Sequence, residues 1–166
     1  MQKRQPSLGN LLWKICLLRQ IDLLSSEYCQ FTGRNRLRTG SQGAYIVAGS
    51  DENPDVILVA SGSEVATLVA GTELLRKDGV KVRIVSAPSE GLFRNQPKEY
   101  QEAILPADAK IFGMTAGLPV TLQGLVGCHG KVWGLESFGF SAPYKVLDEK
   151  LGFTAENVYN QVKAML

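Results

Sequence analysis

The sequence predicts an α/β domain of three layers, in which helices cover both faces of a mostly parallel, five-stranded sheet. Short apolar runs rich in β-branched residues alternate with stretches of helical periodicity from about residue 43 onward. Small residues follow two apolar runs, at 60–63 (Ala-Ser-Gly-Ser) and 138–143 (Phe-Gly-Phe-Ser-Ala-Pro), where a sharp turn into a helix is expected. One run, Val56–Ala60, has no polar face, which is typical of a strand buried between two helix layers.

Five strands are expected, each from a segment of five or six residues bounded by turn-forming residues. They are residues 44–48, 56–60, 80–85, 110–114 and 131–135. The segment Asp-Glu-Asn-Pro at 51–54 forms the turn between the first two strands. Because parallel strands need right-handed crossover connections, the intervening helices are expected on both faces of the sheet.

Five helices are expected between and after these strands. They are residues 63–77, 97–105, 118–126, 142–151 and 155–165. The first of them has Val65, Leu68 and Leu75 at helical spacing, and its stop signal is Asp78 followed by Gly79.

Side chains that cap helix N-termini are expected at three places. Ser61 or Ser63 is expected to cap the helix at 63–77, and Thr154 is expected to cap the last helix. Ser141 is expected to accept a hydrogen bond from the first free N–H groups of the helix at 142–151, where Pro143 has no N–H group to satisfy.

Composition indicates one ordinary globular domain. The chain has 166 residues, of which 45% are hydrophobic and 20% charged, and no apolar run approaches the roughly 18 residues of a membrane span. Residues 1–40 carry seven Lys/Arg and two Asp/Glu, hence +5, and the remainder carries eleven and fourteen, hence −3. A basic cluster confined to residues 33–38 on an otherwise acidic body does not predict nucleic-acid binding.

The three cysteines, Cys16, Cys29 and Cys128, are too scattered for a disulfide framework, and no C-x-x-C motif occurs. A reducing compartment, the cytoplasm, is therefore expected. Cys128 precedes His129, but a zinc site needs four ligands and a catalytic thiol needs a base that faces it. A turn ahead of the strand at Lys131 is favoured over a metal site or a nucleophile.

Four segments in order resemble the C-terminal domain of transketolase. They are residues 55–65 (Asp-Val-Ile-Leu-Val-Ala-Ser-Gly-Ser-Glu-Val), 80–89 (Val-Lys-Val-Arg-Ile-Val-Ser-Ala-Pro-Ser), 138–143 and 152–158 (Gly-Phe-Thr-Ala-Glu-Asn-Val). The resemblance implies the same three-layer α/β fold. It extends from about Gly43 to Leu166 and weakens at 113–120 (Gly-Met-Thr-Ala-Gly-Leu-Pro-Val). We therefore expect a transketolase C-terminal domain at 41–166 and a non-family extension at 1–40.

The resemblance implies a role within a larger enzyme. A transketolase transfers a two-carbon ketol unit between sugar phosphates in the pentose phosphate pathway, with thiamine diphosphate and a divalent metal. The family holds these cofactors with a Gly-Asp-Gly fingerprint and an activating glutamate in two other domains. This chain is therefore expected to bind no cofactor or metal, to supply no catalytic residue, and to be inactive alone. Its expected role is structural, dimer-forming or regulatory, with the other domains upstream or in a separate chain.

Two candidate binding elements follow. The resemblance implies that an arginine just ahead of the domain binds the sugar phosphate, and Arg34 lies in about that place. The favoured alternative is that Arg34 belongs to a solvated run of charged residues. The turn Ser61-Gly62-Ser63 opens a helix whose N–H groups could attract an anion. Glu64 in the first helical turn would repel a phosphate, so a purely structural turn is favoured.

Other functions and assemblies stay open from the sequence. The chain could be a self-standing module that binds a phosphorylated metabolite at residues 61–64. Its basic, apolar stretch at 8–19 could form a helix that docks on a membrane or partner, and the absence of acids before Asp22 is mildly like a mitochondrial presequence. A homodimer is expected through residues 118–140, with Leu122 and Leu125 in the contact.

Overall fold

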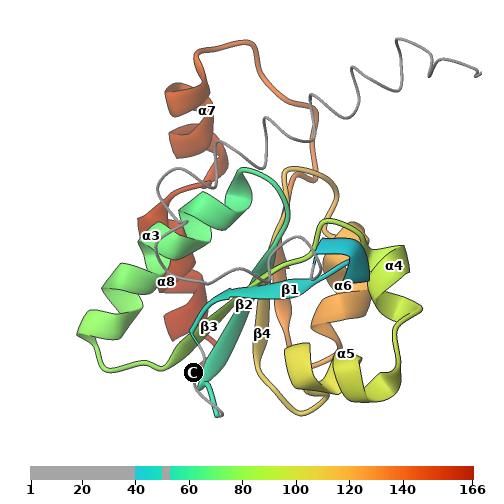
Figure 1. The fold of residues 1–166 in the computed structure, drawn as a ribbon. Helices are drawn as coiled ribbons and strands as arrows, with labels where there is room; N and C mark the ends of the chain where they lie inside the picture. Colours follow the sequence, from blue (N-terminus) through green and yellow to red (C-terminus); the bar gives the residue numbers. More distant parts are fainter. Residues whose placement is uncertain (1–39, 50–52) are drawn as a thin grey trace, which may run out of the picture. The chain divides into compact units, whose positions relative to one another are not determined.

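The computed structural model describes residues 40–49 and 53–166, which form a twisted sheet between two layers of helices (Figure 1). The five strands in sequence order are β1 (Tyr45–Ala48), β2 (Val56–Ala60), β3 (Val82–Ser86), β4 (Ile111–Met114) and β5 (Lys131–Trp133). Their spatial order is β1-β3-β2-β4-β5. β3, β2, β4 and β5 are parallel to their neighbours, and β1 pairs antiparallel with β3. The predicted mostly parallel, five-stranded sheet is confirmed.

Helices cover both faces of this sheet (Figure 1). α3 (Glu64–Lys77) and α8 (Ala155–Lys163) cover one face. The other face carries the helices α4 (Glu90–Arg94), α5 (Lys98–Ile104) and α6 (Val120–Val126). A short 3-10 helix, η1 (Gly40–Gln42), precedes β1, and α7 (Tyr144–Leu151) stands beyond the end of the sheet. None of the described helices is long and apolar enough to cross a membrane.

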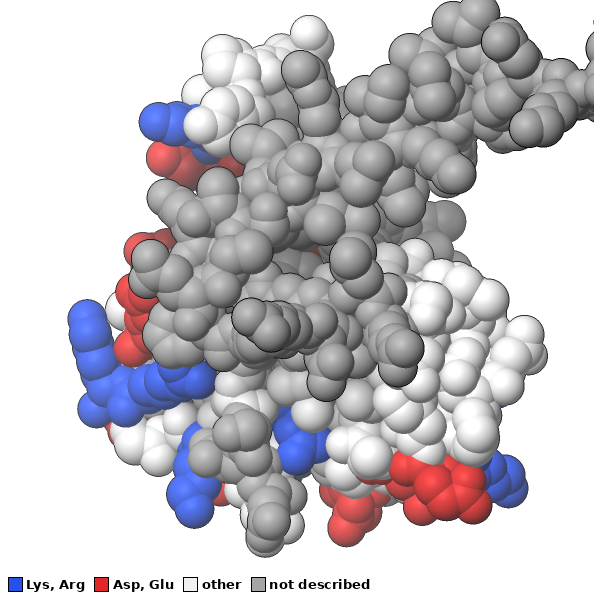
Figure 2. All heavy atoms as spheres, viewed as in Figure 1, with Lys and Arg blue, Asp and Glu red and all other residues white. Residues whose placement is uncertain are grey.

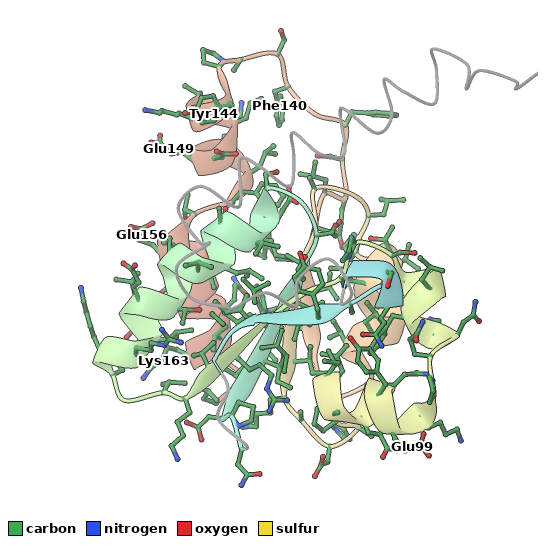
Figure 3. All side chains as sticks on the ribbon, viewed as in Figure 1. Glu99, Phe140, Tyr144, Glu149, Glu156 and Lys163 are labelled. Carbon is green, nitrogen blue, oxygen red and sulfur yellow. The ribbon has the colours of Figure 1, made fainter. Side chains whose placement is uncertain are left out.

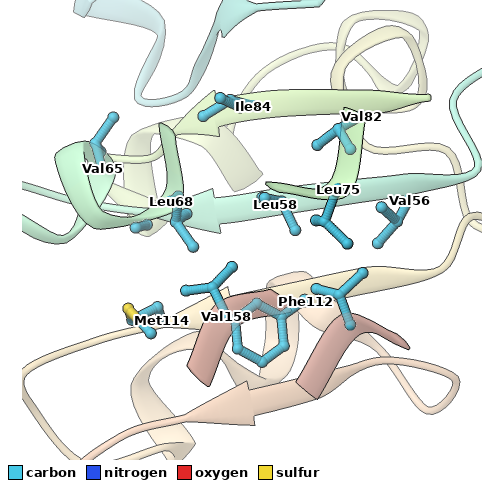
Figure 4. Close-up of a cluster of buried hydrophobic side chains, with 12 residues drawn as sticks. Val56, Leu58, Val65, Leu68, Leu75, Val82, Ile84, Phe112, Met114 and Val158 are labelled. Atoms are coloured by element: carbon cyan, nitrogen blue, oxygen red, sulfur yellow. The ribbon is translucent and has the colours of Figure 1, made fainter. Parts of the chain in front are cut away.

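Each face of the sheet has its own hydrophobic core. Val56 and Leu58 point toward α3 and α8, and Ile57 and Val59 point toward the other helix layer. All residues of β2 are completely buried, because successive side chains of a strand face opposite sides and both sides are covered. Figure 4 shows the first core, in which Phe112 lies among the side chains of the strands and α8.

Helix α4 is the one element of the second layer that the sequence did not predict. Ser89 has an extended backbone, and its hydroxyl accepts a hydrogen bond from the Leu92 N–H. In the sequence, Ser89 followed by Glu90 indicates a helix start, but a five-residue helix is too short to show apolar periodicity. The predicted strands and the other helices are confirmed, with ends that differ by a few residues.

Two of the three predicted helix caps are wrong. Thr154 caps α8 as predicted, with its hydroxyl accepting from the Asn157 N–H at 3.2 Å. Ser63 precedes α3 but has helical angles (φ −65°, ψ −30°) and makes no side-chain cap, because capping needs an extended backbone there. Ser141 is too far from α7, which begins at Tyr144 directly after Pro143.

Candidate functional site

The sheet has a topological switch point between β2 and β4. The chain leaves β2 for α3 on one face, whereas it leaves the neighbouring β4 for α6 on the other face. The two loops that follow these strands, at 61–63 and 115–119, therefore flank the crevice in which α/β sheets usually bind ligands. This edge is the candidate site that the sequence predicted.

The predicted turn lies at this edge. Gly62 has φ +67°, a left-handed conformation that favours glycine, and it allows the sharp exit from β2. The first turn of α3 is closed by the Val65 N–H bonding to the Gly62 carbonyl at 3.4 Å. The structure thus brings Ser61, Gly62 and Ser63 together at the N-terminus of α3, as the sequence predicted.

Glu64 changes the chemistry of this turn. The Ser63 hydroxyl donates to Glu64 Oε1 at 3.1 Å, so the serine serves a carboxylate on the same helix. Glu64 Oε2 would lie 3.6 Å from a Cβ placed on Gly62, so the carboxylate stands over the turn. A negative charge already complements the helix dipole here and repels an incoming phosphate. The geometry therefore favours a structural turn over an anion cradle.

The loop after β4 is held by hydrogen bonds within itself, to β5 and to the chain after β5. Thr115 Oγ1 accepts from the Gly117 N–H at 3.1 Å, and the Thr115 N–H donates to the Trp133 carbonyl at 2.9 Å. The Leu135 N–H donates to the Gly117 carbonyl at 2.9 Å, which ties this loop to the chain after β5. These bonds fix the backbone at this edge of the sheet.

The other predicted residues lie elsewhere. Cys128 and His129 form a turn before β5, as favoured, and the Cys128 thiol is exposed. His129, Asp108 and Lys110 line an open depression at the opposite, amino-terminal edge of the sheet. Within residues 40–49 and 53–166, no three His, Cys, Asp or Glu side chains are grouped to hold a metal. Arg34 lies outside the described residues, so its predicted role stays a prediction.

The turn at the switch point does not fit the diphosphate group of thiamine diphosphate. The helix N-terminus at the switch point, where a diphosphate would bind, is taken by the Glu64 carboxylate. A feature that the sequence predicted only in part lies beyond this edge: every residue from 136 to 146 is exposed, whereas the expected contact surface ended at residue 140. The turn predicted at 138–143 is confirmed, because α7 begins directly after Pro143, and the two phenylalanines in this turn were the available signal for an exposed apolar segment.

Residues 43–154 match the family described as Transketolase-like TK C-terminal domain. The chain is 42% identical over 125 residues to the transketolase of Staphylococcus aureus (strain MW2), covering 75% of this chain and 19% of that protein. It is also 42% identical over 161 residues to transketolase 1 of Vibrio parahaemolyticus, covering 93% of this chain and 24% of that protein. The chain thus spans about a fifth to a quarter of these relatives.

Solved structures agree in fold. The transketolase of Campylobacter jejuni superposes with a TM-score of 0.68 at 35% identity, over 75% of this chain and 19% of that chain. The transketolase from Leishmania mexicana gives a TM-score of 0.72 at 32% identity, over 78% of this chain and 18% of that chain. The shared fold is therefore explained by common descent, and the chain belongs to the transketolase family as a C-terminal domain.

Proposed function

We propose that the chain is the non-catalytic C-terminal domain of a transketolase and works joined to, or assembled with, the domains that hold thiamine diphosphate. The observation that supports this most strongly is the pairing of 42% identity with coverage of only 19% to 24% of the relatives. Most of such an enzyme lies outside the matched segment, and the turn at the switch point does not fit the diphosphate group of the cofactor. The domain then stabilises and assembles the enzyme.

The proposed whole enzyme transfers a two-carbon ketol unit between sugar phosphates, in the cytoplasm and within the pentose phosphate pathway. Thiamine diphosphate and a divalent metal supply the chemistry of carbanion stabilisation when they are bound in the other domains. This chain's own contribution is a rigid α/β unit. The alternative of a self-standing phosphometabolite module is not favoured, because Glu64 stands over the turn that would hold the phosphate.

Arg34 is proposed as a contact to the sugar phosphate. The match to the Vibrio parahaemolyticus enzyme covers 93% of this chain, and 7% of 166 residues is about 12, so the aligned part begins before residue 34. An arginine can bind a phosphate with two parallel hydrogen bonds, which a lysine cannot reproduce. The length of this match supports the proposal, since it extends into residues 1–40.

Self-association of the isolated chain is proposed at a surface near the start of α6. Leu118 and Val120 are exposed there, and Figure 2 shows a largely uncharged area over α4 and α6. Exposed apolar surface on a separate domain tends to pair, most often as a two-fold dimer. The expected contact through Leu122 and Leu125 is wrong, because both side chains are buried in the second core.

A grafted enzyme tests the proposed function. In it, this chain replaces the matching 24% of Vibrio parahaemolyticus transketolase 1. We expect the grafted enzyme to fold and to transfer ketol units between xylulose 5-phosphate and ribose 5-phosphate. In the grafted enzyme, Arg34→Ala should raise the KM for sugar phosphate by about tenfold or more, as expected for a lost charged hydrogen bond. Arg36→Ala is the matched control and should leave the KM unchanged. A folded graft without turnover contradicts the proposed function.

A further inference from the structure

The segment from Glu136 to Val146, called the arm below, is unlike the rest of the domain. All of its residues are exposed, and it contains four of the eight exposed large hydrophobic residues in the described part of the chain. These are Phe138, Phe140, Tyr144 and Val146, which are 97%, 49%, 70% and 50% exposed. The arm carries only two charges, at Glu136 and Lys145. Figure 3 shows Phe140 and Tyr144 on this projection, away from both cores.

The arm is held at its base. At its start, the Leu135 N–H bonds to the Gly117 carbonyl of the β4 loop at 2.9 Å. Beyond its end, Trp133 Nε1 donates to the Leu151 carbonyl at 3.1 Å, at the last residue of α7. Asn157 Nδ2 of α8 donates to the carbonyl of Gly152, the left-handed cap of α7, at 2.7 Å. The arm is thus a shaped element that the domain presents.

The residues of the arm do little for the domain itself. α7 has no buried residue, and Ser141 does not cap it. Phe140 is half exposed, and the cation of Lys150 on α7 lies 4.1 Å from its ring centroid. Two phenylalanines, a tyrosine and a proline in an exposed, nearly uncharged segment resemble the centre of a protein interface, where aromatic residues are enriched and charges are depleted. The composition of the arm is therefore explained by a contact outside this domain.

We infer that the arm docks onto the domains that transketolases carry in the part of their length that this chain does not span. This inference rests on the proposed function, and it names the surface through which the domain joins the enzyme. Those domains make up 76% to 81% of the relatives, from 24% and 19% coverage. Interfaces between domains of one chain commonly bury about 600–1,500 Å². The arm is the longest continuous exposed stretch with this aromatic character in the described residues.

The charges on the arm argue against other occupants. A lipid surface attracts clusters of lysine and arginine, whereas the arm has a single lysine beside a single glutamate in its eleven residues. A folded protein partner with an apolar face is the chemistry that suits this segment. Docking on the cofactor-bearing domains would also place α7 and the carboxyl edge of the sheet against the rest of the enzyme.

The grafted enzyme described above provides the test, in four forms: unchanged, Phe138→Asp with Phe140→Asp, Tyr144→Asp, and Leu166→Asp. Leu166 is a matched control, because it is a 46% exposed leucine whose carbonyl binds Lys110 at the opposite edge of the sheet. The readout is the rate of protease cleavage at the junction between the graft and the preceding domains. Because aromatic anchors dominate interfaces, we expect the two arm variants to be cleaved at least about tenfold faster than the unchanged graft and the control.

The outcomes separate the two proposals. The isolated chain with each substitution should keep its Tm, since the changed residues are exposed, and this shows that faster cleavage reflects lost docking. If the unchanged graft is protected and the arm variants are equally protected, the inference is overturned and the proposed function stands. If the unchanged graft fails to fold or is cleaved at once, the proposed function is overturned and the inference falls with it. The isolated chain could instead form dimers that the arm substitutions abolish, while the same substitutions leave the graft protected. That result would assign the arm to a contact with a second copy of the chain and would overturn the inference.

Discussion

Tyr159 of α8 donates its phenol hydrogen to Asp78 Oδ2 at 2.6 Å, which ties the C-terminal end of α3 to the last helix. Lys163 Nζ lies 3.0 Å from the same oxygen. The Tyr159 hydrogen bond, aided by the one from Lys163, lowers the pKa of Asp78. Bonding to Asp78 raises the pKa of both Tyr159 and Lys163. Asp78 and Lys163 are exposed and Tyr159 is only half-buried, so water and salt weaken the coupling.

The stability of the domain is expected to depend on this cluster in a defined pH window. Because the folded pKa of Asp78 is lowered, its contribution is full above the unfolded value of 3.8 and is lost as pH falls through the folded value. The contributions of Tyr159 and Lys163 are full below 10.0 and 10.5 and are lost as pH rises through their raised values. Asp78→Asn should therefore lower Tm at neutral pH.

Thermal unfolding followed by circular dichroism checks this from neutral pH down to about pH 2. The Tm difference between Asp78→Asn and the unchanged chain should shrink as the pH falls below 3.8. Glu73→Gln, which removes an exposed carboxylate from α3, is the matched control for the loss of one negative charge. A difference in Tm that stays constant with pH would rule out a stabilising charge at Asp78.

Gly71→Ala should destabilise the contact between α3 and α8. A Cβ at Gly71 would lie 2.6 Å from Val158 Cγ1, a completely buried side chain, and α8 would have to move outward. Overpacking of this kind costs about 1–3 kcal/mol, which exceeds the roughly 1 kcal/mol that alanine gains over glycine in a helix. Urea unfolding measures the change, and adding Val158→Ala should recover part of it.

The control for this substitution is Gly91→Ala in α4. A Cβ placed on Gly91 would meet no neighbouring atom within 4 Å, so this change is expected to be neutral or slightly stabilising. Equal losses of stability at the two glycines would contradict the packing explanation, because they would then arise from the alanine itself.

Trp133→Phe should loosen the base of the arm without unfolding the domain. The substitution removes the indole N–H that donates to the Leu151 carbonyl, a bond worth about 0.5–1.5 kcal/mol. Hydrogen exchange should accelerate in α7 and stay slow in β2 and β4, which are buried between the helix layers. Uniform acceleration throughout the sheet would mean that Trp133 stabilises the whole core.

Residues 1–40 are expected to be dispensable for folding. The strands and helices described above begin at Gly40, and both cores are made of residues from Ala44 onward. A chain that starts at Ser41 should keep a cooperative thermal transition near that of the full chain, as measured by calorimetry. An insoluble or molten product would show that the domain boundary lies earlier.

Much of the fold could be predicted because it depends on periodicity. The apolar run at Val56–Ala60 could be placed from its lack of a polar face, and the stop of α3 at Asp78 and Gly79 from residue types that act locally. The predicted cap at Ser63 is wrong because the serine adopts helical backbone angles, which the sequence does not reveal. The predicted dimer contact at Leu122 is wrong because an apolar stripe on a helix has the same sequence pattern whether it faces a core or a partner.

The candidate site was harder to predict for a related reason. That Ser61, Gly62 and Ser63 form a turn follows from their types, but the position of the Glu64 carboxylate over that turn is a matter of side-chain geometry. The turn at 138–143 and the helix after it could be predicted, but the exposure of the whole arm to Val146 could not, because exposure depends on what the rest of the chain leaves uncovered.

Whether this transketolase domain has chemistry of its own is decided by calorimetric titration of the isolated chain with thiamine diphosphate and Mg²⁺, paired with a turnover assay. Xylulose 5-phosphate and ribose 5-phosphate are the substrates for the assay. We expect no binding heat and no ketol transfer, because the turn at the switch point does not fit the diphosphate group of the cofactor. Saturable cofactor binding together with turnover by the pure chain would show instead that the domain is catalytic by itself, contrary to the function proposed for it.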